Sequence, residues 1–145
     1  MREADTSMMM FGFYIWNNVR IGFQTFAGGI LAGVGTAWFL GANGVILGAV
    51  AGYLTQAGFS ETFWSFVAGH SSFELVAIML SGAAGFRLGL PVIAPGNLSR
   101  KAALVAAAKP AVRVIYGAAA LFLLAAFVEA FWSPLTEVGF TAKIA

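Results

Sequence analysis

Residues 21–60 read IGFQTFAGGILAGVGTAWFLGANGVILGAVAGYLTQAGFS, forty positions without one charged side chain and with ten glycines. A water-soluble domain carries charged groups over most of its exterior. This 145-residue chain has only 8 Lys and Arg and 6 Asp and Glu, and 60% of its residues are apolar. Its mean hydropathy is strongly positive. Such a composition is typical of an integral membrane protein.

The apolar runs are continuous and extend for roughly 20 residues, the length that a helix needs to cross the hydrocarbon core. A transmembrane β-barrel would instead show alternating segments of about ten residues. Every backbone N–H and C=O in lipid must be bonded within the protein. We therefore predict an all-α, polytopic transmembrane helical bundle of about four spans, which forms one helical membrane domain over residues 1–145.

The predicted spans are 21–40, 45–60, 73–93 and 114–132. A turn is expected at Gly41–Gly44, because the Asn–Gly pair within it favours turns. The second segment is short for a crossing, and its alternative is a re-entrant hairpin over residues 45–69. Residues 97–113 mix aliphatic and basic side chains and predict an amphipathic interfacial helix, interrupted by Pro110.

The distribution of cations predicts the orientation. Five Lys or Arg and no acid lie between Arg87 and Arg113, whereas residues 1–20 and 133–145 carry equal numbers of acids and bases. The positive-inside rule places this region in the cytoplasm. The predicted cytoplasmic basic loop contains Arg100, Lys101, Lys109 and Arg113. With four crossings both termini face outward, whereas a re-entrant hairpin would put the amino terminus inside.

Several classes of function are disfavoured by composition. The absence of cysteine excludes disulfides and thiolate metal sites. A net charge of +2, dispersed around a membrane protein, offers no basic groove for nucleic acid. A metal site would have at most three ligands, His70, Glu74 and Glu129. This is one fewer than the four of a structural zinc site, and no metal-binding motif supports it. We predict no catalytic residues, no metal, no cofactor and no enzymatic activity.

Small residues recur at four-residue spacing on the predicted spans, which places them on one helix face. Close approach of backbones at such faces holds membrane helices together. The glycines expected to serve this packing are Gly29, Gly33, Gly44, Gly48, Gly52, Gly85 and Gly89.

Four polar side chains fall at membrane depth, namely His70, Glu74, Arg87 and Glu129. A charge at the bilayer centre costs roughly 2.5–3.5 kcal/mol, so such groups face the bundle interior and find partners. Arg87 lies near the predicted cytoplasmic end and is expected to extend its side chain to the interface. Glu129 is open to three interpretations: a neutral carboxyl, a partner of His70 across the bundle, or a group in a water-filled cavity.

Glu74 has two competing interpretations. With Ser71 it forms a Ser–x–x–Glu pattern before an apolar run, which predicts a capping box at a helix start. Alternatively, His70 and Glu74 are four residues apart and share one helix face, as a proton-relay pair or metal ligands would. Both cannot hold fully, because Ser71 as the cap would leave His70 outside the helix.

A series of motifs spread along the chain resembles the stage II sporulation protein M family. These are the runs from Phe13 to Phe23, Ala27 to Ile30 and Gly33 to Thr36, the pairs Asn43-Gly44, Leu47-Gly48, Gly69-His70 and Glu74-Leu75, the run Gly82 to Gly85, Pro95-Gly96 with Arg100, and Glu129 to Pro134. The resemblance implies a multi-pass membrane protein of the bacterial or archaeal cell (inner) membrane. In spore-forming bacteria, the member that gives the family its name is similar to a scaffold. This scaffold holds peptidoglycan-degrading partners at the engulfing membrane.

The family-like positions of this chain are His70, Glu74, Pro95, Arg100 and Glu129, to which the resemblance assigns no roles. Longer family members have an amino-terminal cytoplasmic region and a helix before the part that matches residue 1. We predict a non-enzymatic scaffold or subunit of a membrane or cell-envelope complex, whose partners are the lipid bilayer, other membrane or envelope proteins, and further copies of itself. The alternative is a channel or proton-coupled transporter that uses His70, Glu74 and Glu129.

Overall fold

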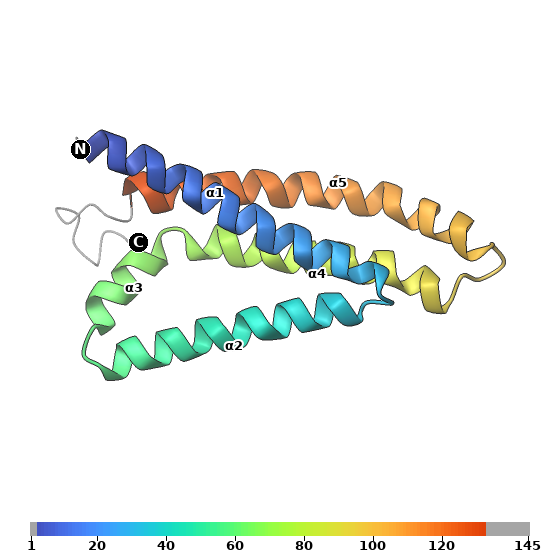
Figure 1. Cartoon of the computed structure of the whole chain (residues 1–145), viewed down its shortest axis with the longest axis horizontal. Helices are drawn as coiled ribbons and strands as arrows, with labels where there is room; N and C mark the ends of the chain where they lie inside the picture. Colours follow the sequence, from blue (N-terminus) through green and yellow to red (C-terminus); the bar gives the residue numbers. More distant parts are fainter. Residues whose placement is uncertain (1–2, 133–145) are drawn as a thin grey trace.

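The computed structural model describes residues 3–132, and the regular structure in this range is entirely helical, as predicted (Figure 1). The predicted end of the last span at Ser133–Pro134 lies outside the described residues. In chain order the elements are α1 (Glu3–Ala27), the 3₁₀ turn η1 (Gly28–Ile30), α2 (Val34–Gln56), α3 (Ser60–Ala68), α4 (Ser71–Ile93), α5 (Arg100–Phe127) and the π-helical stretch η2 (Val128–Trp132).

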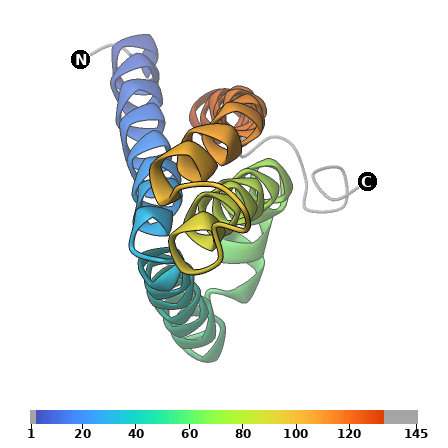
Figure 2. The same cartoon turned by 90° about the vertical axis from the view of Figure 1, so that its right-hand side faces the viewer.

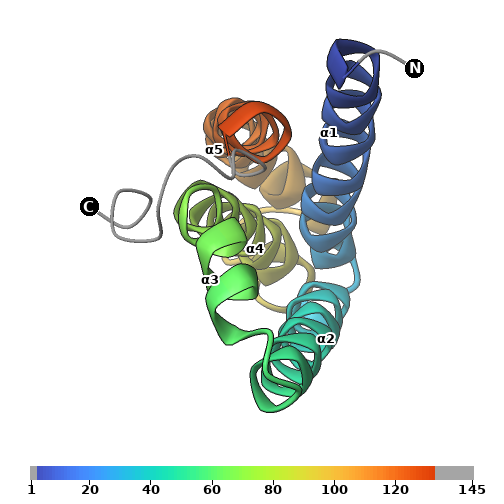
Figure 3. The ribbon, with the colours of Figure 1, turned by 90° about the vertical axis from the view of Figure 1, so that its left-hand side faces the viewer.

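Helix α4 is the centre of the bundle. It packs along α5 and α1 and also contacts η1. Figure 1 shows α1 and α4 running the same way along the long axis, with α5 returning antiparallel to α4. The turn between α4 and α5 lies at one end of the bundle, which faces the viewer in Figure 2, and α3 lies at the other end, which faces the viewer in Figure 3.

Three helical segments are long and apolar enough to cross a membrane, by length and composition: α2, α4, and α5 continued by η2. The 23 residues of α4 extend about 35 Å, which exceeds the roughly 30 Å of a hydrocarbon core. The predicted range 73–93 agrees with α4 to within two residues at its start and ends at the same residue. Pro91 lies inside α4 and does not end it.

The predicted turn at Gly41–Gly44 is wrong, because α2 continues without interruption through these positions. The Asn43 side chain donates a hydrogen bond of 2.7 Å to the Phe39 carbonyl one turn earlier, so it is satisfied within the helix. The chain reverses earlier, at residues 28–33, where Gly33 has a φ of +83°, a conformation that favours glycine. The predicted span 21–40 is therefore divided between α1 and α2.

The segment 97–113 is also not a separate interfacial helix. Residues from Arg100 onward belong to α5, which passes through Pro110 and continues into η2 as one helical segment of 33 residues. Such a segment is about 50 Å long, longer than the hydrocarbon core is thick. Ser99 caps its start by accepting a hydrogen bond from the Ala102 amide at 3.3 Å. One helix thus provides both the basic region and the apolar span.

The seven predicted packing glycines lie in two different settings. A side chain at Gly29 would meet the backbone of Gly85, and one at Gly89 would meet the backbone of Gly33 and the Gly29 carbonyl oxygen. These glycines let α4 contact the α1–α2 junction backbone to backbone. Thr36 completes the junction by donating a hydrogen bond of 2.7 Å to the Thr25 carbonyl. In contrast, a side chain would meet no atom within 4 Å at the three glycines Gly44, Gly48 and Gly52.

The apolar core lies where α4 and α5 meet. Its buried members are Ala77, Ile78, Ala118 and Phe122. Phe122 is the largest of these side chains and is only 3% exposed. Its ring lies directly over Gly22 of α1, so that a methyl group at Gly22 would collide with the ring edge. Three helices therefore converge on this one aromatic ring.

Replacing Phe122 by alanine is expected to lower the free energy of unfolding by about 3–5 kcal/mol. Removal of the ring leaves a cavity that the small residues around it cannot fill. Thermal unfolding of the purified protein in a mild detergent measures the loss. The matched control is Phe23→Ala, since Phe23 is 63% exposed. Equal shifts in the two variants would contradict the assignment of Phe122 to the core.

Candidate functional site

His70 and Glu74 lie together at the start of α4. His70 is the residue that precedes the helix, and its carbonyl oxygen accepts hydrogen bonds from the amides of Phe73 and Glu74, each at 3.1 Å. The helix start carries no side-chain cap, so the capping box of Ser71 and Glu74 is not formed. His70 Nε2 nevertheless lies 4.0 Å from Glu74 Oε2, so the two side chains are neighbours although His70 itself stands just before the helix.

Glu129 reaches the same place from the other end of the chain. It belongs to η2, where the α-helical turn of α5 widens to a π-helical one. Its Oε1 lies 3.8 Å from His70 Nε2. The geometry therefore brings Glu129 beside His70 across the bundle, as one of the three interpretations of the sequence requires. Figure 3 views this end of the bundle, where α5 ends beside the start of α4.

The cluster of His70, Glu74 and Glu129, here called the His–Glu cluster, lies mostly out of contact with solvent. His70 is 4% exposed and Glu129 is 9% exposed. The ring of Phe66 in α3 stands edge-on to the His70 imidazole, with centroids 5.3 Å apart. Phe11 of α1 packs against Phe131, with centroids 5.7 Å apart. An aromatic ring of α3 thus lies directly against the cluster, and the Phe11–Phe131 pair joins α1 to the π-helical stretch that carries Glu129.

Two groups beside the candidate spans respond to this environment. Burial lowers the pKa of His70, and a hydrogen bond with the backbone of Phe66 acts in the opposite direction. Burial raises the pKa of Tyr14 in α1, and the negative charge of Glu129 raises it further.

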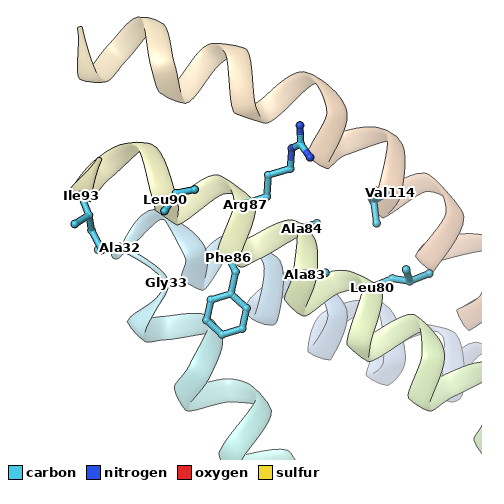
Figure 4. Close-up of a pocket in the computed structure, with 10 residues that line it drawn as sticks. All are labelled: Ala32, Gly33, Leu80, Ala83, Ala84, Phe86, Arg87, Leu90, Ile93 and Val114. Atoms are coloured by element: carbon cyan, nitrogen blue, oxygen red, sulfur yellow. The ribbon is translucent and has the colours of Figure 1, made fainter. Parts of the chain in front are cut away.

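Arg87 does not join the cluster. It follows Glu74 by 13 positions on α4, which separates the two by roughly 20 Å along the helix axis. Arg87 is exposed and lines an open pocket of about 590 Å³ between α4, the junction at Gly33 and Val114 of α5. Figure 4 shows its side chain extending from α4 toward α5.

The four basic residues assigned to the cytoplasmic loop all lie on the first half of α5 and are exposed, namely Arg100, Lys101, Lys109 and Arg113. They are near the turn between α4 and α5, whereas the His–Glu cluster is at the opposite end of the bundle. The chain therefore has one basic end and one end with a buried His–Glu cluster.

Sequence reasoning missed a polar stripe inside the bundle. Asn18 of α1 is only 1% exposed, and Thr25 of the same helix is fully buried. Ser81 faces them from α4 and is 1% exposed. A signal was present, since Asn18, Gly22, Thr25 and Gly29 recur at spacings of four, three and four residues, which marks one helix face.

The chemistry available to the His–Glu cluster follows from its donor atoms. One imidazole nitrogen and one oxygen from each of two carboxylates lie within 4.8 Å of one another. Such a set can share protons among its members or hold a cation. Among the described residues, only this group of His, Asp and Glu side chains has the number and proximity that metal binding requires.

Comparison with known proteins gives one match. The family model described as stage II sporulation protein M matches residues 2–134, nearly the whole chain. No curated protein and no solved structure shows significant similarity. The match includes the candidate spans, the His–Glu cluster and the basic half of α5. With a match of this extent, the chain belongs to the stage II sporulation protein M family.

Proposed function

We propose that this protein is a non-enzymatic, multi-pass scaffold or subunit of a complex in the bacterial or archaeal inner membrane, and that α2 recruits its partner through a helix-to-helix contact. The observation that carries the proposal is the exposed glycine face of α2. Family membership supports the membrane setting. The family is not known as an enzyme family, which supports the non-enzymatic role.

Helix α2 is poorly covered by the rest of the chain. Of the 18-residue apolar stretch that makes each helix a candidate span, only 11% is buried in α2, against 50% in α4. Its buried residues are Gly35 and Thr36, both in the first turn. Beyond the first turns the helix diverges from the bundle (Figure 1). Most of α2 is therefore available to another molecule.

The open face of α2 has the features of a helix-packing surface. Gly41, Gly44, Gly48 and Gly52 follow one another at spacings of three or four residues, and a side chain at any of them would meet nothing within 4 Å. Membrane helices associate through such faces because small residues let the backbones approach closely. The junction of Gly29 with Gly85 in the same chain uses the same kind of contact. The occupant that fits is an apolar transmembrane helix of a partner membrane protein.

Blocking this face is expected to remove the partner without unfolding the chain. We expect the protein, extracted in mild detergent from the membrane of its own cell, to co-purify with a membrane partner in the wild type. Gly48→Leu should abolish this association, because the added side chain separates the two backbones. Quantitative mass spectrometry of the purified material measures the ratio of partner to bait.

The matched control is Gly117→Leu on α5, since a side chain at Gly117 also meets nothing within 4 Å. This variant should retain the partner at the wild-type ratio. Retention of the same partner by Gly48→Leu, or recovery of the wild type as a monomer alone, would contradict the proposal. Loss of a self-associated form in Gly48→Leu would identify a second copy of the chain as the occupant.

The transport hypothesis draws on a different observation, the meeting of three ionisable side chains in the His–Glu cluster. Residues of this kind within a membrane protein commonly mark ion or proton routes. The hypothesis requires flux of protons or ions across proteoliposomes containing the pure protein. We place it second because the open face of α2 accounts for the scaffold role without such a route.

A further inference from the structure

We propose that His70, Glu74 and Glu129 form a binding site for one divalent transition-metal ion, of the kind that zinc exemplifies. The site lies at the end of the bundle where α4 begins and α5 ends. It is independent of the partner surface on α2, so it stands or falls separately from the scaffold proposal. From the sequence alone these three residues are the most that a metal site could have, but no metal is predicted, because no motif in the sequence links Glu129 to His70 and Glu74.

The donor atoms are close to the spacing that a metal ion imposes. Zinc binds nitrogen and oxygen ligands at about 2.0–2.2 Å, so two ligands of a tetrahedral ion lie roughly 3.4 Å apart. His70 Nε2 is 3.8 Å from Glu129 Oε1 and 4.0 Å from Glu74 Oε2. These two distances need to shorten by about half an ångström, and the three donor atoms, which lie within 4.8 Å of one another, would close around the ion by side-chain rotation.

The charges of the cluster also fit a dication. A divalent ion with two carboxylates and a neutral imidazole gives a neutral assembly, which is favourable in an environment where uncompensated charge is expensive. The mixture of one imidazole and two carboxylates suits zinc and its first-row neighbours.

A second observation points to a ligand at this position. Glu129 is 9% exposed, and its Oε2 is buried without a hydrogen-bond partner among the described residues. A buried carboxylate oxygen normally has a partner. The other oxygen of the same carboxylate, Oε1, is the one that lies 3.8 Å from His70 Nε2. A metal ion bound through both carboxylate oxygens would provide Oε2 with a partner.

The local backbone supports the assignment. Glu129 lies in a π-helical stretch, a rare geometry that occurs often at functional sites. The His70 ring hydrogen-bonds the backbone of Phe66, and metal-binding histidines commonly hold their orientation by a bond of this type. Three protein ligands leave a coordination position for water. A bound ion would connect the start of α4 to the end of α5.

The test uses the full chain, purified in mild detergent with an affinity tag that contains no histidine. The protein is stripped with a chelator, equilibrated with zinc against a competing chelator, and freed of excess metal. We expect one zinc per chain by elemental analysis. X-ray absorption should show one imidazole nitrogen among the ligands, which must be His70 because the chain has a single histidine.

Three variants and one control identify the ligands. We expect His70→Gln, Glu74→Gln and Glu129→Gln each to weaken zinc binding by at least about tenfold. Glu61→Gln should bind like the wild type, because Glu61 is an exposed acid of α3 outside the cluster. Gel filtration and thermal unfolding show whether each variant is folded.

Absence of stoichiometric zinc in the folded wild type would overturn the proposal, as would equal binding by the wild type and the three folded variants. Should the variants not fold, the wild-type absorption spectrum decides: zinc with oxygen ligands alone would exclude His70 and contradict the site. Since none of these readouts involves a partner, a negative result here leaves the scaffold proposal intact, and loss of the α2 partner leaves the metal site intact.

Discussion

Gly29→Leu is expected to prevent the bundle from assembling, with a loss of more than about 3 kcal/mol in the free energy of unfolding. The position faces the Gly85 backbone so closely that even a methyl group collides with its carbonyl carbon and Cα. Neither partner is a flexible side chain that can move away. The collision would force α4 away from the junction at residues 28–33, and the buried Thr36–Thr25 hydrogen bond would break with it.

The measurement is the fraction of protein that elutes as a monodisperse peak in mild detergent, together with its unfolding temperature. The same substitution in Gly48→Leu is the control, since that position is open and the variant should fold like the wild type. Gly29→Leu behaving like Gly48→Leu would mean that the helices do not pack through these glycines. The pair also separates folding from recruitment, because only the open glycine face of α2 is proposed to bind a partner.

The two groups of glycines show what sequence patterns leave undetermined. Gly29 with Gly33 and Gly44 with Gly48 have the same four-residue spacing, yet the first pair lies against α4 and the second faces outward. Spacing identifies a face that can pack, but not the helix that covers it. That choice depends on where the chain reverses, and the sequence favoured the wrong turn.

The turn was predicted wrongly for a physical reason. Asn–Gly is a strong local signal in water, but within an apolar helix Asn43 satisfies its amide at the Phe39 carbonyl and the helix continues. The reversal occurs instead where Gly33 adopts a positive φ. By contrast, α4 was predicted almost to its ends, because a long apolar run marks it and Pro95 follows two positions after its last residue, Ile93.

The candidate site was only partly predictable. The spacing of His70 and Glu74 indicates neighbours on a helix, and the structure places them 4.0 Å apart. The contribution of Glu129 depends on the antiparallel pairing of α4 with α5 and on the π-helical turn that reorients its side chain. Neither feature has a local sequence signal, so the sequence left the role of Glu129 open among three possibilities.

We propose that α4 carries the chain from one side of a membrane to the other, with the basic start of α5 in the cytoplasm and α3 outside. Thr62 of α3 and Ala102 in the first turn of α5 are both exposed. Figure 1 shows α3 and the start of α5 at opposite ends of the bundle. The chain has no cysteine, so Thr62→Cys and Ala102→Cys each introduce a single reactive thiol. Labelling each variant in sealed cells reports its side directly.

A membrane-impermeant thiol reagent added outside intact cells should label Thr62→Cys. It should label Ala102→Cys only after the membrane is permeabilised, because the positive-inside rule keeps the four basic residues of α5 within the cell. The unsubstituted protein should give no signal under either condition. Labelling of both positions from outside intact cells, or of Ala102→Cys alone, would contradict the membrane crossing or its direction.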